Sequence, residues 1–338
     1  MRLGFGPGQL ELAGALRQAL ERECPPSQVR ASVAQGWSRR RWRALAELGV
    51  TGAGAPPERG GLGLGLAELA LLVEECGRAG VPEPVGPSAA VAVPLLARLG
   101  DGQAGRWLEA VAQGEVVAVV APAGARLVAG AGRADLVLGA GPSGLVALSP
   151  PAGVAELEGS LDPTRPLAEV DWALARPLGA PAGPLGALAG DLGALAAAAE
   201  ALGVAQRVVE MAAGHARSRH QFGRPVGSFQ AVKHLLADAL LPLEFARPLV
   251  WRAARSLELG DPGAPVHVAM AKAYASRAAR VACRAGLQVH GAMGYTWECD
   301  LQLWLKRGWS LASQWGDEAR HRQRVARALL GPAGARAG

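Results

Sequence analysis

The stretch RSRHQFGRPVGSFQAVKH, residues 217–234, interrupts alanine- and leucine-rich sequence that has helical periodicity on both sides of it. A turn between two helices needs only a glycine or a proline. To that minimum this stretch adds four cations: Arg217, Arg219, Arg224 and Lys233. It also adds two aromatic and two amide side chains: Gln221, Phe222, Phe229 and Gln230. This surplus of charged, flat and hydrogen-bonding groups indicates that the corner formed by residues 217–234 holds a ligand.

The bulk composition predicts a soluble, globular chain with two or three domains. The 338 residues are 50% apolar and 19% charged, and no basic segment followed by an apolar stretch opens the chain. No run of about 18 apolar residues is expected to span a membrane. The cysteines form no CxxC pair, which argues against a disulfide framework or a zinc site and favours reduced thiols in the cytoplasm. They are Cys24, Cys76, Cys283 and Cys299.

The net charge of +6 does not indicate a nucleic-acid partner. Only three of the basic residues are lysines, and the arginines are spread among acidic residues. The one dense run, Arg320 to Arg327, has apolar residues between its charges, as on the solvated face of a helix. No metal site is expected either, because no carboxylate accompanies the histidines near the corner at ligand spacing. His267 and His321 are predicted to lie on helix surfaces.

The hydrophobic pattern divides the chain into three regions and predicts an α+β fold. Residues 1–113 alternate helical segments with short Gly/Pro breaks, and the glycine-rich loop 52–65 lacks the GxGxxG spacing of a dinucleotide-binding turn. Residues 114–183 contain short Val- and Leu-rich runs punctuated by Gly and Pro, typical of a small antiparallel β domain. Residues 184–330 predict a four-helix bundle, and residues 331–338 a disordered tail. The expected bundle helices are 185–219, 229–259, 265–290 and 301–330, the last broken near Gly316.

This order of helices, β domain and bundle, together with the corner, resembles the acyl-CoA dehydrogenase family over nearly the whole chain. The N-terminal motif is LAELGVTGAGAPPERGGLGLGLAELALLVEECGRAG, and the C-terminal motifs are RSRHQFGRPVGSFQAVKHLLAD, AMAKAYAS and LQVHGAMGYTWECDLQLWLKR. The resemblance extends to the short subunits of actinobacterial enzymes of this family that degrade steroids and pair a short subunit with a full-length one.

The resemblance implies that the corner holds the ADP half of an FAD that is shared across a subunit interface, with the isoalloxazine ring on the neighbouring subunit. The planar guanidinium of Arg219 would bind the pyrophosphate. A second segment, at the end of a bundle helix, would bring its backbone close to the dinucleotide, although Ala292 replaces the family's second glycine there. The implied cofactor-binding residues are Arg219, Gln221, Phe222, Phe229, Gln230, Gln288, His290 and Gly291.

Two parts of the family's active site have no counterpart in this sequence. Family members carry a Thr-Glu-Pro and Ser-Asp loop and a tryptophan-containing strand that contact the flavin ring, whereas residues 116–139 read VVAVVAPAGARLVAGAGRADLVLG. Where the family places its catalytic glutamate, this chain has Trp315 in one location and Gly193 in the other. The candidates for the base are Asp317, Asp191 and Glu318, and a carboxylate next to Gly316 is better explained as the N-cap of the following helix.

The sequence therefore predicts a subunit of a heteromeric, FAD-dependent acyl-CoA dehydrogenase. Its partner would be a full-length subunit of the same family, in an α2β2 heterotetramer that supplies the flavin-ring platform and the base. The expected substrate is the CoA thioester of a bulky acyl group such as a steroid side chain, and the expected electron acceptor is an electron-transfer flavoprotein. Small residues of the bundle are expected to pack against a second bundle: Ala269, Ala271, Ala273 and Ala278.

Two alternatives remain open at this point. One is a homotetrameric dehydrogenase with a divergent β domain and Asp317 as its base. The other is a non-catalytic scaffold subunit that binds no flavin.

Overall fold

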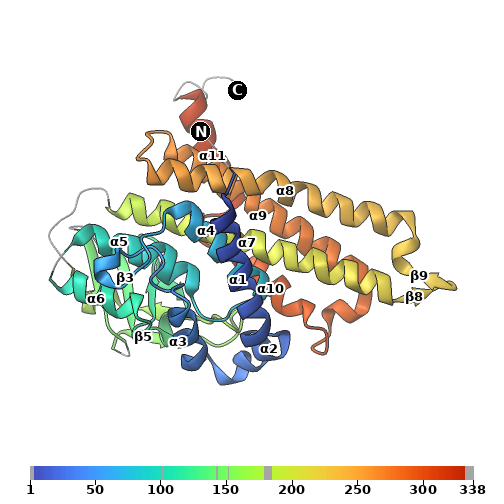
Figure 1. Ribbon diagram of the computed structural model, residues 1–338, viewed down its shortest axis with the longest axis horizontal. Helices are drawn as coiled ribbons and strands as arrows, with labels where there is room; N and C mark the ends of the chain where they lie inside the picture. The colour runs from blue at the N-terminus through green and yellow to red at the C-terminus, as the bar shows by residue number, and fades with distance from the viewer. Residues whose placement is uncertain (1–3, 101, 142–143, 151, 179–184, 332–338) are drawn as a thin grey trace.

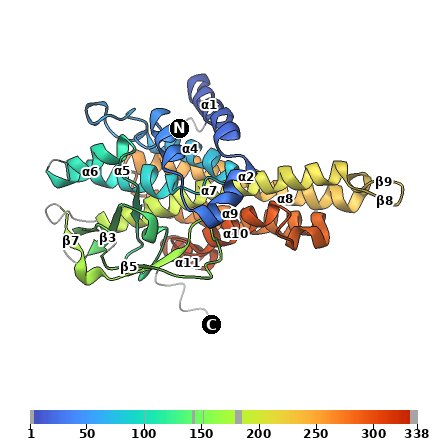
Figure 2. The same cartoon turned by 90° about the horizontal axis from the view of Figure 1, so that it is seen from below.

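The computed structural model describes residues 4–100, 102–141, 144–150, 152–178 and 185–331. The N-terminal helices and a small β domain lie against one half of a long C-terminal helix bundle, and the corner lies at the other end of that bundle (Figure 1 and Figure 2). The predicted α+β fold class is therefore confirmed. Of the tail predicted at 331–338, only Gly331 lies within the described residues.

The N-terminal region begins with helices whose starts and ends follow from proline and glycine. Prolines occupy the first turns of the first two helices, where a missing N–H costs nothing. Gly80 ends α4 with a φ of 69°, and a side chain at this position would collide with Trp304 of the bundle. The helices are α1 (Pro7–Glu23), α2 (Pro26–Gln35), α3 (Arg39–Glu47), α4 (Leu66–Ala79), the π-helix η2 (Gly86–Ala92), α5 (Val93–Leu99) and α6 (Gln103–Ala112).

The β domain consists of two small sheets with its own hydrophobic core. One sheet has the order β1 (Ala118–Val120), β3 (Leu136–Gly141), β4 (Gly144–Leu148), β7 (Arg176–Pro177). The other has the order β2 (Leu127–Ala129), β6 (Leu167–Val170), β5 (Val154–Glu156). β1 pairs with β3 in parallel, Ala118 lying opposite Leu136, so the prediction of a purely antiparallel domain is wrong for this pair. A chain segment crosses between the two strands, which a parallel pair requires.

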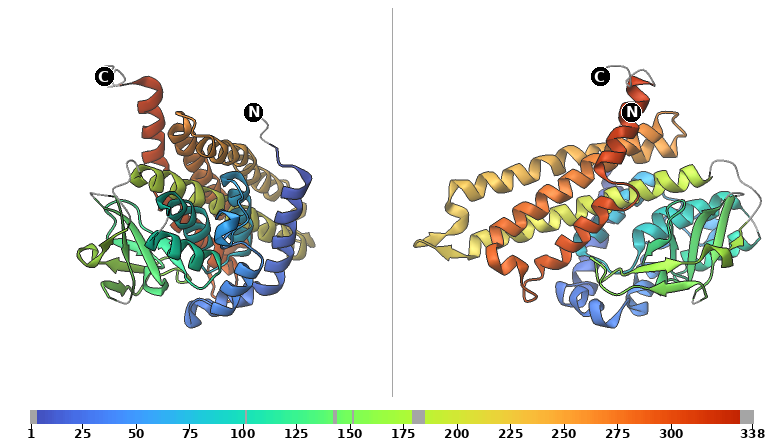
Figure 3. Two further views of the ribbon diagram at one scale, coloured as in Figure 1. Left: turned by 60° about the vertical axis from the view of Figure 1, so that its left-hand side comes forward. Right: turned by 180° about the vertical axis from the view of Figure 1, so that it is seen from behind.

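The bundle has the helices that the sequence predicted, with ends that agree within about one residue. They are α7 (Leu185–Ser218), α8 (Gln230–Glu258), α9 (Ala264–His290), α10 (Leu301–Ser313) and α11 (Glu318–Leu330). The close packing of α7 against α4 is evident at Gly203, where an added side-chain carbon would lie 1.8 Å from the Glu74 carbonyl oxygen. After the break at Gly316, α11 crosses the long helices steeply (Figure 3).

Two expectations about apolar surfaces are corrected by the bundle. α7 does contain an 18-residue window apolar enough to span a membrane, but 83% of that window is buried in the protein. The four alanines expected to face a second bundle are instead buried inside this one, with exposed fractions of 0 to 5%. Small residues are equally suited to close packing within a chain. The exposed large apolar side chains of α8 are Leu240, Leu241 and Phe245.

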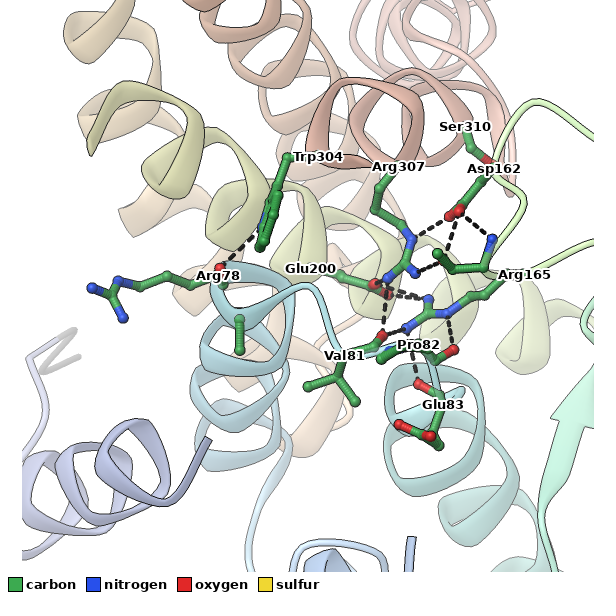
Figure 4. A network of polar contacts seen from close by, with 12 residues as sticks. Arg78, Val81, Pro82, Glu83, Asp162, Arg165, Glu200, Trp304, Arg307 and Ser310 are labelled. Carbon is green, nitrogen blue, oxygen red and sulfur yellow. Dashed lines mark hydrogen bonds and ion pairs between the residues drawn. The ribbon is translucent and has the colours of Figure 1, made fainter. Parts of the chain in front are cut away.

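A buried charge network joins the N-terminal region, the β domain and the bundle (Figure 4). Glu200 of α7 accepts hydrogen bonds from Arg165 and Arg307, each at 2.8 Å, and Arg307 also pairs with Asp162. Arg165 donates further bonds to carbonyl groups of the segment after α4, at Val81, Pro82 and Glu83. Although burial opposes ionisation, the two guanidinium groups hold the pKa of Glu200 below its ordinary value. Two cations and two anions thus neutralise one another in the interior, which fixes the β domain on the bundle.

Candidate functional site

The corner is a β-hairpin followed by a short helical turn. β8 (His220–Gln221) pairs with β9 (Arg224–Pro225) across a two-residue turn, and η5 (Val226–Ser228) leads into α8. Both turn residues have positive φ, 55° at Phe222 and 77° at Gly223, as a type I′ turn requires. A phenylalanine in this conformation is rare and is strained, which is typical of functional segments. The turn holds the Phe222 ring 90% exposed, edge-on to Phe229 with ring centroids 6.1 Å apart.

The corner carries positive charge that no carboxylate neutralises. Between Glu210 and Asp238 the sequence contains no acidic residue. The Arg224 guanidinium lies 4.2 Å from the centre of the Phe229 ring, a cation–π contact that also leaves the charge uncompensated. Within the described residues no ion pair involves the cations of the corner, which are Arg217, Arg219, Arg224 and Lys233. A surface of this kind favours an anionic ligand.

The second predicted segment lies beside the corner, as the end of α9 and the 3-10 helix η6 (Gly291–Tyr295). The His290 ring stacks on His215 in the last turn of α7, with centroids 4.4 Å apart and planes 22° from parallel. Gly291 has a φ of 61°, so its backbone conformation favours glycine, and the space around it is open. Gln288 and Ala292 are exposed. The structure thus brings this segment, through His290, to the helix end from which the corner starts.

A cleft of about 1010 Å³ lies between the β domain and the bundle. The β domain and the corner lie toward opposite ends of the bundle (Figure 1). The β wall of the cleft is formed by small or apolar residues of 120–129, and the described residues of that wall carry no hydroxyl or amide side chain. Its opposite wall is one face of α11 with three arginines: Arg320, Arg324 and Arg327. The dense basic run predicted as a solvated face therefore lines a cleft.

Trp315 lies against Gly193 at the side of this cleft. The carbon that an alanine would add at position 193 would lie 2.2 Å from Trp315 Cδ2, so only glycine leaves room for the indole ring. Trp315 has a φ of 58°, unusual for a bulky residue, and its carbonyl accepts a hydrogen bond from His321 Nε2 at 3.0 Å. The two positions at which the sequence lacked a glutamate are therefore in contact with each other, and an indole ring fills the space between them.

Each candidate base already has a partner. Asp317 is the N-cap of α11, as expected, because its Oδ1 accepts from the backbone N–H of Arg320 at 2.8 Å. Asp191 lies 2.7 Å from Arg324 Nη1, and its side chain is 7% exposed. Glu318 pairs with Arg280 and, at 3.5 Å, with Arg322. None of the three acids is therefore an unpartnered carboxylate directed at the cleft.

Two buried residues, Lys272 and His321, hold the chain around Trp315 in place, and neither role was predicted from the sequence. Lys272 of α9 is fully buried and donates to the Leu311 carbonyl at 3.0 Å, at the end of α10. Burial lowers the pKa of Lys272 to about 7, although Asp317 opposes the shift. His321 is only 4% exposed, so its prediction as a surface residue is wrong. A lone lysine within the apolar sequence AMAKAYAS was the one signal that could have revealed Lys272.

The other titratable groups of the described residues form no cluster of metal ligands. Among the residues that the structure describes, no three His, Cys, Asp or Glu side chains are placed to hold a metal ion. The four cysteines are unpaired, and burial raises the pKa of Cys24 and of Cys283 to about 12. His267 is partly buried and lies 2.8 Å from the Ser256 hydroxyl.

Comparison with known proteins agrees with this architecture along the whole chain. The family model described as acyl-CoA dehydrogenase, N-terminal domain, matches residues 7–115, and the C-terminal domain model matches residues 191–330. The chain belongs to the acyl-CoA dehydrogenase family, whose members are flavin-dependent oxidoreductases that use FAD.

One relative found by sequence and two solved structures illustrate this similarity. The acyl-CoA dehydrogenase IpdE2 of Mycobacterium tuberculosis is 36% identical over 286 residues, which cover 83% of this chain and 85% of the relative. A chain of the Tcur3481-Tcur3483 steroid ACAD G363A variant superposes with a TM-score of 0.86 at 25% identity, covering 97% and 99% of the two chains. Butyryl-CoA dehydrogenase from Megasphaera elsdenii shows the same fold, with a TM-score of 0.86 at 21% identity and coverage of 98% and 100%.

The two ends of an FAD fit this chain unequally. When bound, the flavin accepts the hydride that leaves the acyl chain. The corner offers unpaired guanidinium groups, an exposed aromatic ring and amides, a donor set that suits the diphosphate and adenosine. The β wall of the cleft offers the flavin ring no hydroxyl or amide side chain. The residues of this chain therefore fit the ADP end and not the ring.

Proposed function

We propose that this chain is the subunit of a heteromeric acyl-CoA dehydrogenase that completes the FAD site of its partner. Its corner binds the ADP half of the cofactor. The partner, a full-length subunit of the same family in an α2β2 assembly, supplies the ring platform and the glutamate that removes the α-proton. The substrate is the CoA thioester of a steroid side chain, and an electron-transfer flavoprotein takes up the electrons.

The contact between Trp315 and Gly193 carries this proposal. Removal of the α-proton needs a carboxylate within hydrogen-bond reach of the substrate. The two positions that could supply it are a tryptophan and a glycine, and the indole ring fills the room beside the glycine. The nearest acids cap α11 or pair with arginines. This chain is therefore suited to assisting the reaction at another subunit's site rather than catalysing it alone.

The corner supports the other half of the proposal. Among the described residues its four cations have no carboxylate partner, and it lies at the other end of the bundle from the β domain (Figure 1). Such charges repel one another unless an anion lies between them. Two solved relatives favour a paired assembly and a steroid substrate, since one is the Tcur3481-Tcur3483 steroid ACAD and another is the ChsE4-ChsE5 complex from Mycobacterium tuberculosis.

Co-expression with a full-length subunit of the same family tests the proposal. The co-purified complex should show flavin absorbance and should desaturate a steroid side-chain CoA thioester. Replacing the partner's glutamate should abolish turnover, whereas Asp317→Asn and Asp191→Asn in this chain should retain it if assembly is preserved. Loss of turnover in an assembled, flavin-loaded Asp317→Asn complex would contradict the proposed division of roles.

A further inference from the structure

The stacked imidazoles of His215 and His290 are the feature of the bundle end that the proposed function leaves unexplained. They come from two helices and lie face to face, with centroids 4.4 Å apart. Both rings are partly exposed. Two protonated imidazoles at this distance would repel each other, so the stack favours at most one proton.

The hydrogen bonds define which nitrogen can take up a proton. His290 Nδ1 lies 2.8 Å from the Gly286 carbonyl oxygen, and because a carbonyl only accepts, Nδ1 must carry the hydrogen. Nε2 of His290 is therefore the nitrogen that this hydrogen bond does not engage. Within the described residues, no hydrogen bond involves the ring nitrogens of His215. Both rings thus have a nitrogen available to donate to an anion once protonated.

The charges around the stack are all positive. The segments that build this end of the bundle, residues 211–234 and 280–297, contain no carboxylate. Partial burial, then His290, then Arg219 lower the pKa of His215 below its ordinary value. The cations on the helices and strands packed here are Arg217 within and Arg219 just after the end of α7, Arg224 on β9, Lys233 on α8 and Arg284 on α9, whereas Arg280 further along α9 is paired with Glu318. An anion bound among these cations would offset their positive charge and would favour a proton on the histidine pair.

We propose that His215 and His290 are part of the cofactor corner and that the pair takes up a proton when the diphosphate of FAD binds there. This inference rests on the proposed function, since it assigns His215, in addition to the already predicted His290, to the same site. The anion supplies the negative charge that the corner lacks, and the protonated pair then donates to it beside Arg219.

The sign of the pH dependence follows from linkage. The free corner disfavours the proton and the occupied corner favours it, so the cofactor binds more tightly as the pH falls. Uptake of one proton changes the dissociation constant by up to about tenfold per pH unit between the two pKa values. FAD affinity of the heteromer should therefore fall by roughly three- to tenfold for each pH unit from 6 to 8.

The experiment is a titration of FAD into the apo-heteromer at pH 6.0, 7.0 and 8.0, together with calorimetry in buffers of different ionisation enthalpy. Wild type should bind FAD with uptake of close to one proton. The double variant His215→Asn/His290→Asn should lose most of both the pH dependence and the proton uptake. His267→Asn is the matched control, a partly buried histidine near the start of α9 and outside both the corner and the stack, and it should keep both.

The outcomes separate this inference from the proposed function. If Arg219→Ala weakens FAD binding but the wild type shows no proton uptake, or if the double variant retains it, the role of the histidine pair is overturned and the proposed function stands. If Arg219→Ala leaves FAD affinity unchanged at every pH, the corner does not bind the cofactor and both fail.

Discussion

Trp315 and Gly193 are in such close contact that even a methyl group on residue 193 would fall 2.2 Å from the indole ring. The two residues are 122 positions apart, and Trp315 lines the cleft between the β domain and the bundle. Several measurable consequences follow from this contact and from the corner.

Gly193→Ala should destabilise the chain by about 1–3 kcal/mol, because the indole must move out of a packed position. A Gly-to-Ala change inside a helix ordinarily stabilises by roughly 0.5–1 kcal/mol, so the sign itself is diagnostic. Gly214→Ala on the same helix is the matched control, since nothing lies within 4 Å of the added carbon. Urea unfolding measures both, and a stabilised Gly193→Ala variant would rule out the contact.

Arg219→Ala should lower the FAD affinity of the heteromer by about one to two orders of magnitude, because a charge-assisted contact to the pyrophosphate contributes roughly 1.5–3 kcal/mol. Assembly should survive, since Arg219 is exposed and outside the bundle core. Arg219→Lys should recover only part of the affinity, as an ammonium group cannot reproduce the planar fork. Equal affinities in wild type and Arg219→Ala would favour a scaffold subunit without flavin.

The chain purified alone should contain little flavin, because its cleft offers the ring no hydroxyl or amide partners on the β wall. The absorbance spectrum of the recombinant chain is the measurement. Stoichiometric flavin in that preparation, together with reduction of an acceptor by acyl-CoA, would instead support a homotetramer that acts on its own. Arg219→Ala would then remove the flavin from the isolated chain.

Association with the partner should depend on the exposed apolar face of α8. Leu241 and Phe245 are 55% and 66% exposed and four residues apart, so they lie on one face of the helix. Phe245→Glu should prevent co-purification of the partner while leaving the fold intact. Leu259→Glu, at a 63% exposed position beyond the end of α8, is the control and should leave assembly unchanged.

Lys272 should make the stability of the chain rise with pH. Its pKa is lowered from 10.5 to about 7 in the folded protein, so the unfolded chain binds the extra proton between these values. Stability therefore increases from about pH 7 upward, by up to about 1.4 kcal/mol per pH unit from this residue. Lys272→Met should remove this increment between pH 7 and 9. Lys233→Met, an exposed lysine, should retain it.

The sequence predicted the bundle helices well because long apolar periodicities and Gly or Pro breaks are local properties. It could not predict that β1 pairs with β3 in parallel, since pairing depends on where a distant strand lies. The expectation that Ala269 and Ala271 pack against a second bundle was wrong, because a small side chain suits a close contact inside the chain as well as between chains. The domain limits at 113 and 183 and the cofactor residues stay predictions.

At the candidate site, the sequence indicated which groups were missing but not what replaced them. Trp315 and Gly193 were each recognised in place of a glutamate, yet their contact depends on the strained φ of Trp315 and on Lys272 holding the end of α10. The capping role of Asp317 was predictable because it depends only on the neighbouring helix. The His215–His290 stack was not, because it joins the ends of two helices 75 residues apart.

The buried network of Glu200, Arg165, Arg307 and Asp162 determines how the molecule comes apart. Opening the segment at Val81 to Glu83, or detaching the β domain, would leave charged groups of this network buried without their partners, at a cost of several kcal/mol. Partial opening is therefore penalised almost as heavily as complete unfolding. Native-state hydrogen exchange should consequently find the amides around this segment exchanging together with those of α7, as one cooperative unit, while the hairpin at Phe222 exchanges freely.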